Sequence, residues 1–458
     1  MKRRKQVFSL LVACLLVTVL VLSACSKEET NDKDKGNVEQ GQGEKQQPKA
    51  VKPEDQKPVT LRLLTWFVGQ YQEEFDLFHE KYPWITIEPL VVGGDNEMMA
   101  KQAALQAAGD SADLTWIADL SVWIKDGLLE DLSPYVAADQ TIQNADVADG
   151  FIDAFKTGDK MYAMPFSKIA EWILVNKDMM QKKGLELPSN DWTYDQFLEL
   201  AKKGTDAAAG EYGIANDSLF MSQFKWSVPV ANGNADNLVY MNSDLTQSVA
   251  NNPAVINDLR WVQDLTTKWH VMPTPEEAEK IGWDGNSAFL TGKALFALGA
   301  DWTLPGLVKE AKFNWDILPM PMGKAKQVTT QILGPIGILA ASKNKEAAFK
   351  WISFQFELEA QKWMLDNGSN TYIKHPDLDK YIDEVSLWKG KNIEAVKISN
   401  KMCCSLPNAN IPLWGKYNGE VDIAATGMLQ NGGDLSSIIP AVDNWNKETL
   451  KARKELGW

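Results

Sequence analysis

Tryptophan is the residue type whose abundance in this sequence points most directly to a chemistry. The chain of 458 residues contains 18 Trp but only 3 His. An indole ring has a flat apolar face that stacks on the C–H faces of sugar rings, while its N–H remains available for a hydrogen bond. The few histidines weaken any case for metal binding or histidine-based acid–base catalysis. About two thirds of the tryptophans are nevertheless expected to pack in the core.

The elements that must position these rings alternate between strand and helix patterns. Apolar strand patterns occupy 59–66, 85–92 and 113–117, and helical patterns occupy 71–82 and 98–108. Such alternation predicts an α/β fold with a parallel, doubly wound sheet, in which ligands bind beyond the carboxyl ends of the strands. Trp66, Trp116 and Asp119 lie at such ends. Their position favours them over other residues of the same type as binding residues.

The first 24 residues have the pattern of a secretory signal peptide. Met1–Lys5 is cationic, Val7–Leu22 is a nearly continuous apolar run, and small residues follow. This pattern is typical of a cleaved signal, and the run is short for a transmembrane helix. The motif Leu22-Ser-Ala-Cys25 resembles the bacterial lipobox, in which the cysteine receives diacylglycerol and becomes the mature N-terminus. We therefore expect lipidation at Cys25, with an ordinary signal peptide as the alternative.

Residues 25–58 are predicted to form a disordered linker that holds a folded body away from the lipid surface. The segment from Ser26 to Pro58 has seven Lys and eight Asp or Glu and almost no apolar residue. It cannot bury enough apolar surface to offset the entropy of ordering. A flexible chain of this length spans about 30 Å. The remaining 400 residues, 59–458, are too many for one ordinary core and predict two domains.

Charge and cysteine content exclude some partners. The net charge of −14 argues against binding to nucleic acid or to anionic lipid. No metal-ligand spacing surrounds Cys403 and Cys404, which are adjacent in sequence. Adjacent cysteines rarely form a disulfide because its geometry is strained. They are interpreted either as small packing residues or as an unusual vicinal disulfide.

Several short motifs occur in an order that resembles one protein family. Together they resemble the family 1 extracellular solute-binding proteins, which are receptors of sugar ABC importers related to maltose-binding protein. The resemblance covers the chain from Val59 to its end, and the one departure is that Ser369–Tyr372 replaces a proline-containing segment after Gly368. The motifs are Tyr162-Ala-Met-Pro165, Val175-Asn-Lys-Asp178, Trp192-Thr-Tyr-Asp-Gln-Phe197, Phe289-Leu-Thr-Gly-Lys-Ala294, Gly299-Ala-Asp-Trp302, Phe313-Asn-Trp-Asp-Ile-Leu-Pro319 and Ala347-Ala-Phe-Lys-Trp-Ile352.

The resemblance implies a two-lobed, periplasmic-binding-protein-like α/β fold with hinge-crossing segments and a ligand cleft between the lobes. The implied N-lobe comprises 59–167 and 338–400, and the implied C-lobe comprises 168–337 and 401–458. The chain would cross between lobes near 167–170 and again near 334–337. Gly334 and Gly337 suit a hinge backbone, although they could instead relieve crowding within a strand.

The resemblance also implies which residues would form the binding site. Trp302 and Trp414 match positions that place stacking rings in the family, and Trp66 and Trp116 would face them from the other lobe. Charged acceptors strengthen hydrogen bonds from hydroxyl groups and supply selectivity. The candidate acceptors are Asp119, Glu171 and Asp301, with Trp172 and Trp283 as further aromatic candidates. The alternative for each of these residues is packing in the core.

The function implied by the resemblance is to capture a carbohydrate and deliver it to an ABC permease. The number of aromatic residues favours an oligosaccharide. The protein would be a monomer on the extracellular face of the cytoplasmic membrane, without catalytic residues, metal or cofactor, and would not bind nucleic acid. One alternative is a lipid-anchored glycoside-active enzyme with two carboxylates. However, the sequence contains neither a Gly-x-Ser-x-Gly nor a His-Glu-x-x-His motif. Another alternative is a sugar sensor or adhesin without a transporter.

Overall fold

The computed structural model describes residues 57–66, 69, 71–147, 151–152, 155–216, 218–283, 287–402 and 411–457. The predictions for the signal peptide, Cys25, most of the linker, Cys403 and Cys404 lie outside these residues. No helix among the described residues is long and apolar enough to cross a membrane.

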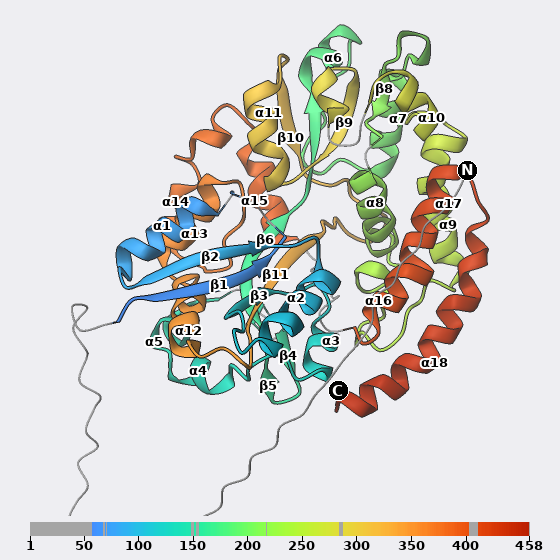
Figure 1. Cartoon of the computed structure of the whole chain (residues 1–458). Helices are drawn as coiled ribbons and strands as arrows, with labels where there is room; N and C mark the ends of the chain where they lie inside the picture. Colours follow the sequence, from blue (N-terminus) through green and yellow to red (C-terminus); the bar gives the residue numbers. More distant parts are fainter. Residues whose placement is uncertain are drawn as a thin grey trace, which may run out of the picture. The chain divides into compact units, whose positions relative to one another are not determined.

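Two separate sheets organise the folded body (Figure 1). The first has the order β2-β1-β3-β11-β6, and the second has the order β10-β7-β9-β8. The first is formed by β1 (Val59–Thr65), β2 (Ile85–Val91), β3 (Leu114–Trp116), β6 (Met164–Ala170) and β11 (Gln331–Ile338). The second is formed by β7 (Trp172–Asn176), β8 (Tyr212–Ile214), β9 (Ala294–Gly299) and β10 (Trp315–Leu318), and a separate hairpin joins β4 (Lys156–Thr157) to β5 (Lys160–Met161).

In the first sheet, β1 is parallel to both β2 and β3, as the alternating strand and helix patterns predicted. β11 is antiparallel to β3 and to β6. The outer strand β2 contains Pro89 beside Glu88. Proline has no N–H to donate to a ladder and is tolerated in edge strands.

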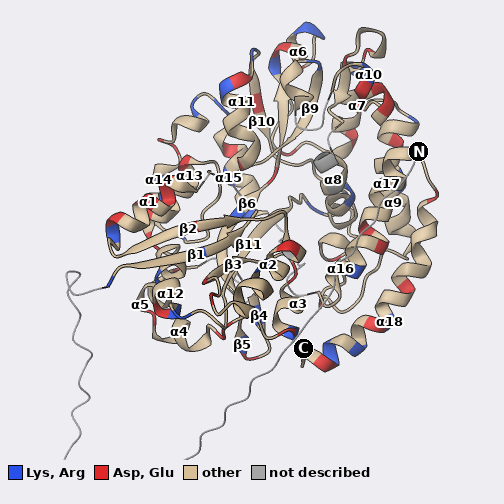
Figure 2. Cartoon of the chain, viewed as in Figure 1, with Lys and Arg blue, Asp and Glu red and all other residues tan. Residues whose placement is uncertain are grey.

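Helices surround both sheets and carry most of the charged side chains (Figure 2). Those that precede β9 are α1 (Gln72–Lys81), α2 (Asp95–Ala107), α3 (Leu120–Lys125), α4 (Ser133–Ala138), α5 (Gln140–Asn144), α6 (Lys177–Lys182), α7 (Tyr194–Gly204), α8 (Ser218–Ala231), α9 (Pro253–Thr267) and α10 (Pro275–Lys280). Those that follow β9 are α11 (Leu304–Glu310), α12 (Lys345–Phe354), α13 (Leu358–Asp366), α14 (Pro376–Tyr381), α15 (Ile393–Lys401), α16 (Trp414–Tyr417), α17 (Ala424–Asn431) and α18 (Ile439–Leu456), with a π-helix at Asn418–Ile423 between α16 and α17.

Local sequence signals explain where the helices begin. α7 begins after Thr193, whose side chain accepts a hydrogen bond from the backbone N–H of Gln196. The side chain of Gln196 accepts a hydrogen bond from the backbone N–H of Thr193 in return, which completes a capping box. A second capping box joins Thr274 and Glu277 at the start of α10. These caps satisfy N–H groups that the first turn of a helix leaves without partners.

Two clusters of buried apolar side chains fill the body, and β7 lies between them. Trp172 and Leu174 belong to one cluster, whereas Ile173 and Val175 belong to the other. Successive side chains of a strand point to opposite faces of the sheet, so a strand covered on both faces is apolar throughout. This explains why β7 reads as an uninterrupted apolar run.

The chain passes from one sheet to the other over a single residue. β6 ends at Ala170 in the first sheet, β7 begins at Trp172 in the second, and Glu171 lies between them. Gly334 and Gly337, by contrast, lie inside β11. A Cβ atom at 334 would lie 2.4 Å from Ser167 Oγ, and one at 337 would lie 2.9 Å from Ile117 Cδ1. Relief of crowding, one of the two interpretations of these glycines, accounts for Gly337, whereas at Gly334 the close atom is the rotatable hydroxyl oxygen of Ser167.

The segment that contains α15 packs against the second sheet, next to β7 and β10. Lys391 Nζ donates to the carbonyl of Trp315 at 2.9 Å, and the backbone N–H of Asn392 donates to Asp316 Oδ1 at 2.7 Å. The end of α15 is bonded to the first sheet as well, because Gln331 Nε2 of β11 donates to the carbonyl of Met402 at 2.6 Å. The segment therefore contacts both sheets.

Candidate functional site

The carboxyl ends of the parallel strands in the first sheet point toward one edge of the second sheet. Within the first sheet, Trp116 pairs with Ile336, while β6 and β11 continue beyond that point to the pair Ala170–Gln331. In the second sheet, Trp172 at the start of β7 pairs with Gly299 at the end of β9. Because only Glu171 separates Ala170 from Trp172, the two edges are neighbours.

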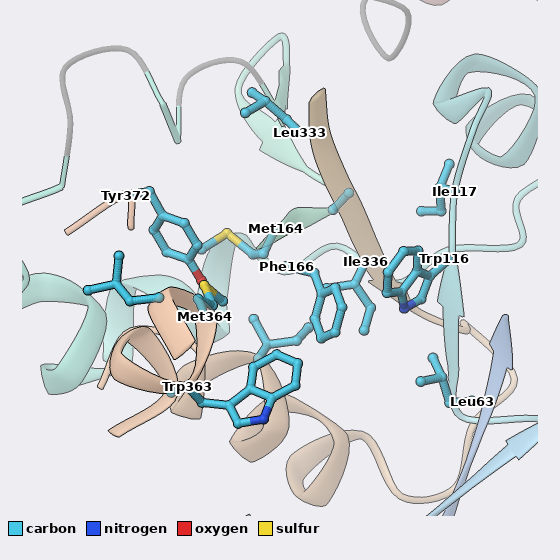
Figure 3. Packing of buried hydrophobic residues seen from close by; sticks show 14 of the residues in the cluster. Leu63, Trp116, Ile117, Met164, Phe166, Leu333, Ile336, Trp363, Met364 and Tyr372 are labelled. Carbon is cyan, nitrogen blue, oxygen red and sulfur yellow. The ribbon is translucent and has the colours of Figure 1, made fainter. Parts of the chain in front are cut away.

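An aromatic cluster forms the edge of the first sheet. Trp116 ends β3 and is only 4% exposed. Its ring centroid lies 5.6 Å from that of Trp66, 5.4 Å from that of Tyr71 and 4.6 Å from that of Phe166. Figure 3 shows Trp116 beside Phe166 and Ile336. The structure thus brings Trp66 and Trp116 together. Trp66 is half-buried and is the more accessible of the two.

The aromatic cluster is closely packed. The cavity that Tyr71, Trp116 and Phe166 help to line has a volume of about 20 Å³. Such a space holds about one water molecule. Trp116 therefore forms part of a solid wall behind Trp66.

Asp119 links the first sheet to the segment that carries Trp414. Its Oδ1 accepts a hydrogen bond from Ser121 Oγ at 2.6 Å, and its Oδ2 accepts one from the backbone N–H of Gly415 at 3.2 Å. Trp414 precedes Gly415 and begins α16. Asp119 and the Trp414 segment, far apart in sequence, are therefore in direct contact.

The backbone immediately before Trp414 is strained. Leu413 has φ 58° and ψ 32°, which is the left-handed region. This conformation is uncommon for a residue other than glycine and costs roughly 1–2 kcal/mol. Strained positions gather where the surroundings fix a side chain for function. The ring of Trp414 itself is largely buried and lies 6.1 Å from that of Tyr417.

Glu171 is fully buried at the junction between the sheets. Its backbone N–H donates to the carbonyl of Thr330 at 3.2 Å, and its own carbonyl accepts a hydrogen bond from Thr329 Oγ1. These bonds fix the backbone at the point where the chain changes sheet. The side chain therefore projects from a rigid position beside both edges.

Asp301 and Trp302 lie just beyond the end of β9, in a 3₁₀ turn that leads into α11. Asp301 is 7% exposed. Its Oδ1 accepts a hydrogen bond from the backbone N–H of Trp302 at 2.6 Å, and its Oδ2 accepts one from Ser369 Oγ. Burial raises the pKa of Asp301 to about 6, while these hydrogen bonds act in the opposite direction. Trp302 is half-buried, so its ring is accessible.

Two other candidate tryptophans are packed in the core. Trp283 lies with its ring centroid 5.7 Å from that of Tyr212 in an edge-on arrangement. Trp172 is fully buried and lies edge-on to Trp388, with centroids 5.7 Å apart. Trp283 and Trp172 belong to the same cluster of buried apolar side chains. Both rings therefore have the packing role that the sequence analysis kept as the alternative.

Sequence reasoning missed residues that hold the candidates in place. Gly415 and Ser369 are the partners of Asp119 and Asp301, and Tyr71 and Phe166 support Trp116. Ser369 carried a signal, because it begins the segment that departs from the family pattern. Tyr71 appeared only as part of an apolar helix stripe. Among the described residues, no group of three or more His, Cys, Asp or Glu could hold a metal ion.

Comparison with protein families gives a match over most of the body. The family model described as bacterial extracellular solute-binding protein matches residues 66–362. A curated relative from Brucella abortus (strain 2308), described as a binding protein, is 22% identical over 336 residues. The match covers 70% of this chain and 77% of the relative.

Solved structures of binding proteins have the same fold. The ABC substrate-binding protein of Listeria monocytogenes in complex with cycloalternan has a TM-score of 0.70 and 24% identity, covering 88% of this chain and 100% of that chain. UgpB from Mycobacterium tuberculosis in complex with glycerophosphocholine has a TM-score of 0.69 and 16% identity, covering 87% and 99%. Maltose-bound MalE3 of T. maritima has a TM-score of 0.63 and 20% identity, covering 85% and 98%. These likenesses confirm the predicted two-lobed α/β fold.

Proposed function

The chain belongs to the family of bacterial extracellular solute-binding proteins, and we propose that it captures a carbohydrate outside the cell for an ABC permease. Capture takes place when the two lobes close on the sugar and shift the equilibrium between open and closed forms. The protein then presents the sugar to the permease unchanged. In this role it acts as a monomer and needs no cofactor.

The observation that carries this proposal is the pair of neighbouring sheet edges. One edge presents Trp66 against the wall formed by Trp116, and the other presents Trp302 beside the buried Asp301. Aromatic faces suit the apolar faces of a sugar ring, and carboxylates accept hydrogen bonds from its hydroxyl groups. Asp119, Glu171 and Trp414 complete the proposed site.

An oligosaccharide is the ligand class we favour, because each additional sugar ring needs an aromatic face of its own. Related binding proteins have been solved in complex with cycloalternan and with maltotetraose, which supports a sugar of several rings. Glycerophosphocholine, named for another relative, is the chief competing class.

A thermal-shift screen of the mature protein tests the ligand class. Maltotetraose, cycloalternan and glycerophosphocholine are the first compounds to compare, because a ligand that binds only the folded state raises the midpoint of unfolding. The midpoint should rise with at least one oligosaccharide and not with glycerophosphocholine. A shift with glycerophosphocholine alone would reject the carbohydrate proposal. Appearance of shorter sugars after prolonged incubation would instead indicate an enzyme.

The N-terminal sequence supports a lipid anchor on Cys25. A diacylglyceryl group there would keep the receptor at the outer face of the cytoplasmic membrane, within reach of a permease. Cys25→Ser should release the protein into the soluble fraction of cells. Continued incorporation of a labelled fatty acid into this variant would contradict anchoring at Cys25.

A further inference from the structure

A further cavity of about 850 Å³ lies beside β6 and β11, and none of the seven residues of the proposed sugar site lines it. Its walls come from those two strands, the end of α13, residues 371–374, α14 and α15. In Figure 1, α14 is to the left of β6 and β11, whereas α3 and α16 are to the right. Its described lining includes no residue of α3 or α16, the helices beside Asp119 and Trp414.

Lys168 is the most unusual residue in this cavity, because it is a buried cation without an acidic partner among the described residues. The side chain is 7% exposed, and its Nζ donates to the carbonyl of Asn400 at 3.2 Å. No carboxylate forms an ion pair with it among the residues that the structure describes. Burial lowers the pKa of Lys168 to about 8, as expected for an ammonium group removed from water without a compensating charge. Buried charges are normally paired.

The other charged groups around the cavity are also mostly cationic. Lys374, Lys397 and Lys401 line it with a single carboxylate, that of Asp379. Lys397 forms an ion pair with Asp383 at 2.6 Å, and Lys374 lies 4.0 Å from Asp146. Among the described residues the lining therefore carries four lysines and one acid, and Lys168 and Lys401 form no ion pair with a described carboxylate, which favours an anionic occupant.

Apolar and neutral polar groups complete the walls. Phe151 stacks on Tyr372 with ring centroids 4.7 Å apart, and Leu365, Ile373 and Ile382 add aliphatic surface. Asn400 Oδ1 is buried and accepts no hydrogen bond from the described residues. A small-molecule site typically has this composition, with apolar walls and a few polar groups that orient the ligand.

We propose that this cavity binds a small organic anion whose carboxylate pairs with Lys168, whose apolar body packs against the walls and whose hydroxyl donates to Asn400 Oδ1. Thr371 and Tyr372 of its lining belong to the segment that departs from the family pattern. The same segment also reaches the proposed sugar site, because Ser369 Oγ donates a hydrogen bond to Asp301 Oδ2.

Calorimetric titration of the mature protein with para-hydroxybenzoate tests the proposal, because this probe combines a carboxylate, a ring and a hydroxyl. Para-hydroxybenzamide is the uncharged control, and inorganic phosphate is the anion without an apolar body. The amide and phosphate should each bind at least about tenfold more weakly than the benzoate, as loss of a charge-assisted bond or of apolar contacts predicts. Equal binding of the amide, or binding of phosphate alone, would overturn the proposal.

Two variants assign the binding to the cavity. Lys168→Met removes the charge at similar length and should weaken benzoate binding at least about tenfold. Lys401→Met removes an exposed lysine of the same lining and should change affinity by less than about twofold. Equal affinities of Lys168→Met and the unsubstituted protein would refute the assignment.

A measurement on the unsubstituted protein covers the case in which Lys168→Met does not fold. Because Lys168 loses its proton near pH 8, benzoate affinity should fall markedly between about pH 6.5 and about pH 9.5. Lys374, Lys397, Lys401 and Asp379 face the same space. Acetic anhydride should modify Lys168 more slowly when para-hydroxybenzoate is present. Unchanged affinity with pH together with unchanged labelling of Lys168 would reject the site.

Discussion

The two neighbouring sheet edges use tryptophan in opposite ways. At the first edge, Trp116 is enclosed by three aromatic rings and forms a wall. At the second edge, Trp302 is half-buried above a carboxylate that is itself buried. The packing around a ring, rather than the residue type, therefore decides whether the ring stabilises the fold or remains available to a ligand. Variants at the two edges should therefore affect different measurements.

Trp116→Ala should have the largest effect, and the effect should be on stability. Removing a buried indole leaves a cavity, which lowers the free energy of unfolding by ~3–5 kcal/mol. Urea denaturation measures this change. Trp66→Ala is the matched control and should lower the free energy of unfolding less, because that ring is half-buried. A loss below ~1 kcal/mol for Trp116→Ala would mean that the aromatic wall is not tightly packed.

Asp301→Asn should change how stability depends on pH. The pKa of Asp301 is about 6 in the folded protein, above the ordinary value of 3.8, so the folded state binds its proton more tightly than the unfolded state. The carboxyl therefore destabilises the fold progressively as pH rises from about 4 to about 6, by up to ~3 kcal/mol above that range. Asparagine does not titrate, so the stability of the original protein relative to Asp301→Asn should fall across this range.

Denaturation of both proteins at about pH 4 and about pH 7 checks this prediction. Asp178→Asn is a control of opposite sign, because a hydrogen bond from Asn314 lowers the pKa of the exposed Asp178. A stability difference between the original protein and Asp301→Asn that does not vary with pH would show that burial of Asp301 costs nothing.

Trp302→Ala should affect ligand binding more than stability. Loss of an accessible aromatic contact weakens binding by ~2 kcal/mol, which is about thirtyfold. Calorimetry with the sugar found in the thermal-shift screen measures the affinity, and Trp302→Phe should retain part of it because a ring remains. If the free energy of unfolding fell while the affinity of the folded protein was unchanged, the two edges would not differ as described.

Asp119→Ala should have the smallest effect. This substitution removes the acceptor of the hydrogen bond from the backbone N–H of Gly415. Loss of one hydrogen bond costs ~1 kcal/mol, which corresponds to about a fivefold loss of sugar affinity. Asp119→Asn keeps an acceptor oxygen and should lose less. An affinity equal to that of the original protein in Asp119→Ala would exclude a contribution of this bond to closure.

Much of the fold could be predicted from local patterns, and less of the site. The alternation of strands and helices from Val59 to Trp116 is confirmed because each element carries its own periodicity. The enclosure of Trp116 could not be predicted, because Phe166 reaches it through the pairing of distant strands. The contact of Asp301 with Ser369 likewise joins segments 68 residues apart. Burial of this kind depends on tertiary packing, which no local pattern encodes.

Pro89 in the outer strand β2 has a consequence for how copies of this protein meet. An exposed strand edge is a template for pairing with a strand of another molecule, and proline and charge at that edge discourage such pairing. Pro89 cannot donate a backbone hydrogen bond to an incoming strand, and the neighbouring Glu88 adds a charge that is repelled by its counterpart. High local concentrations of the folded protein should therefore not promote self-association through this edge.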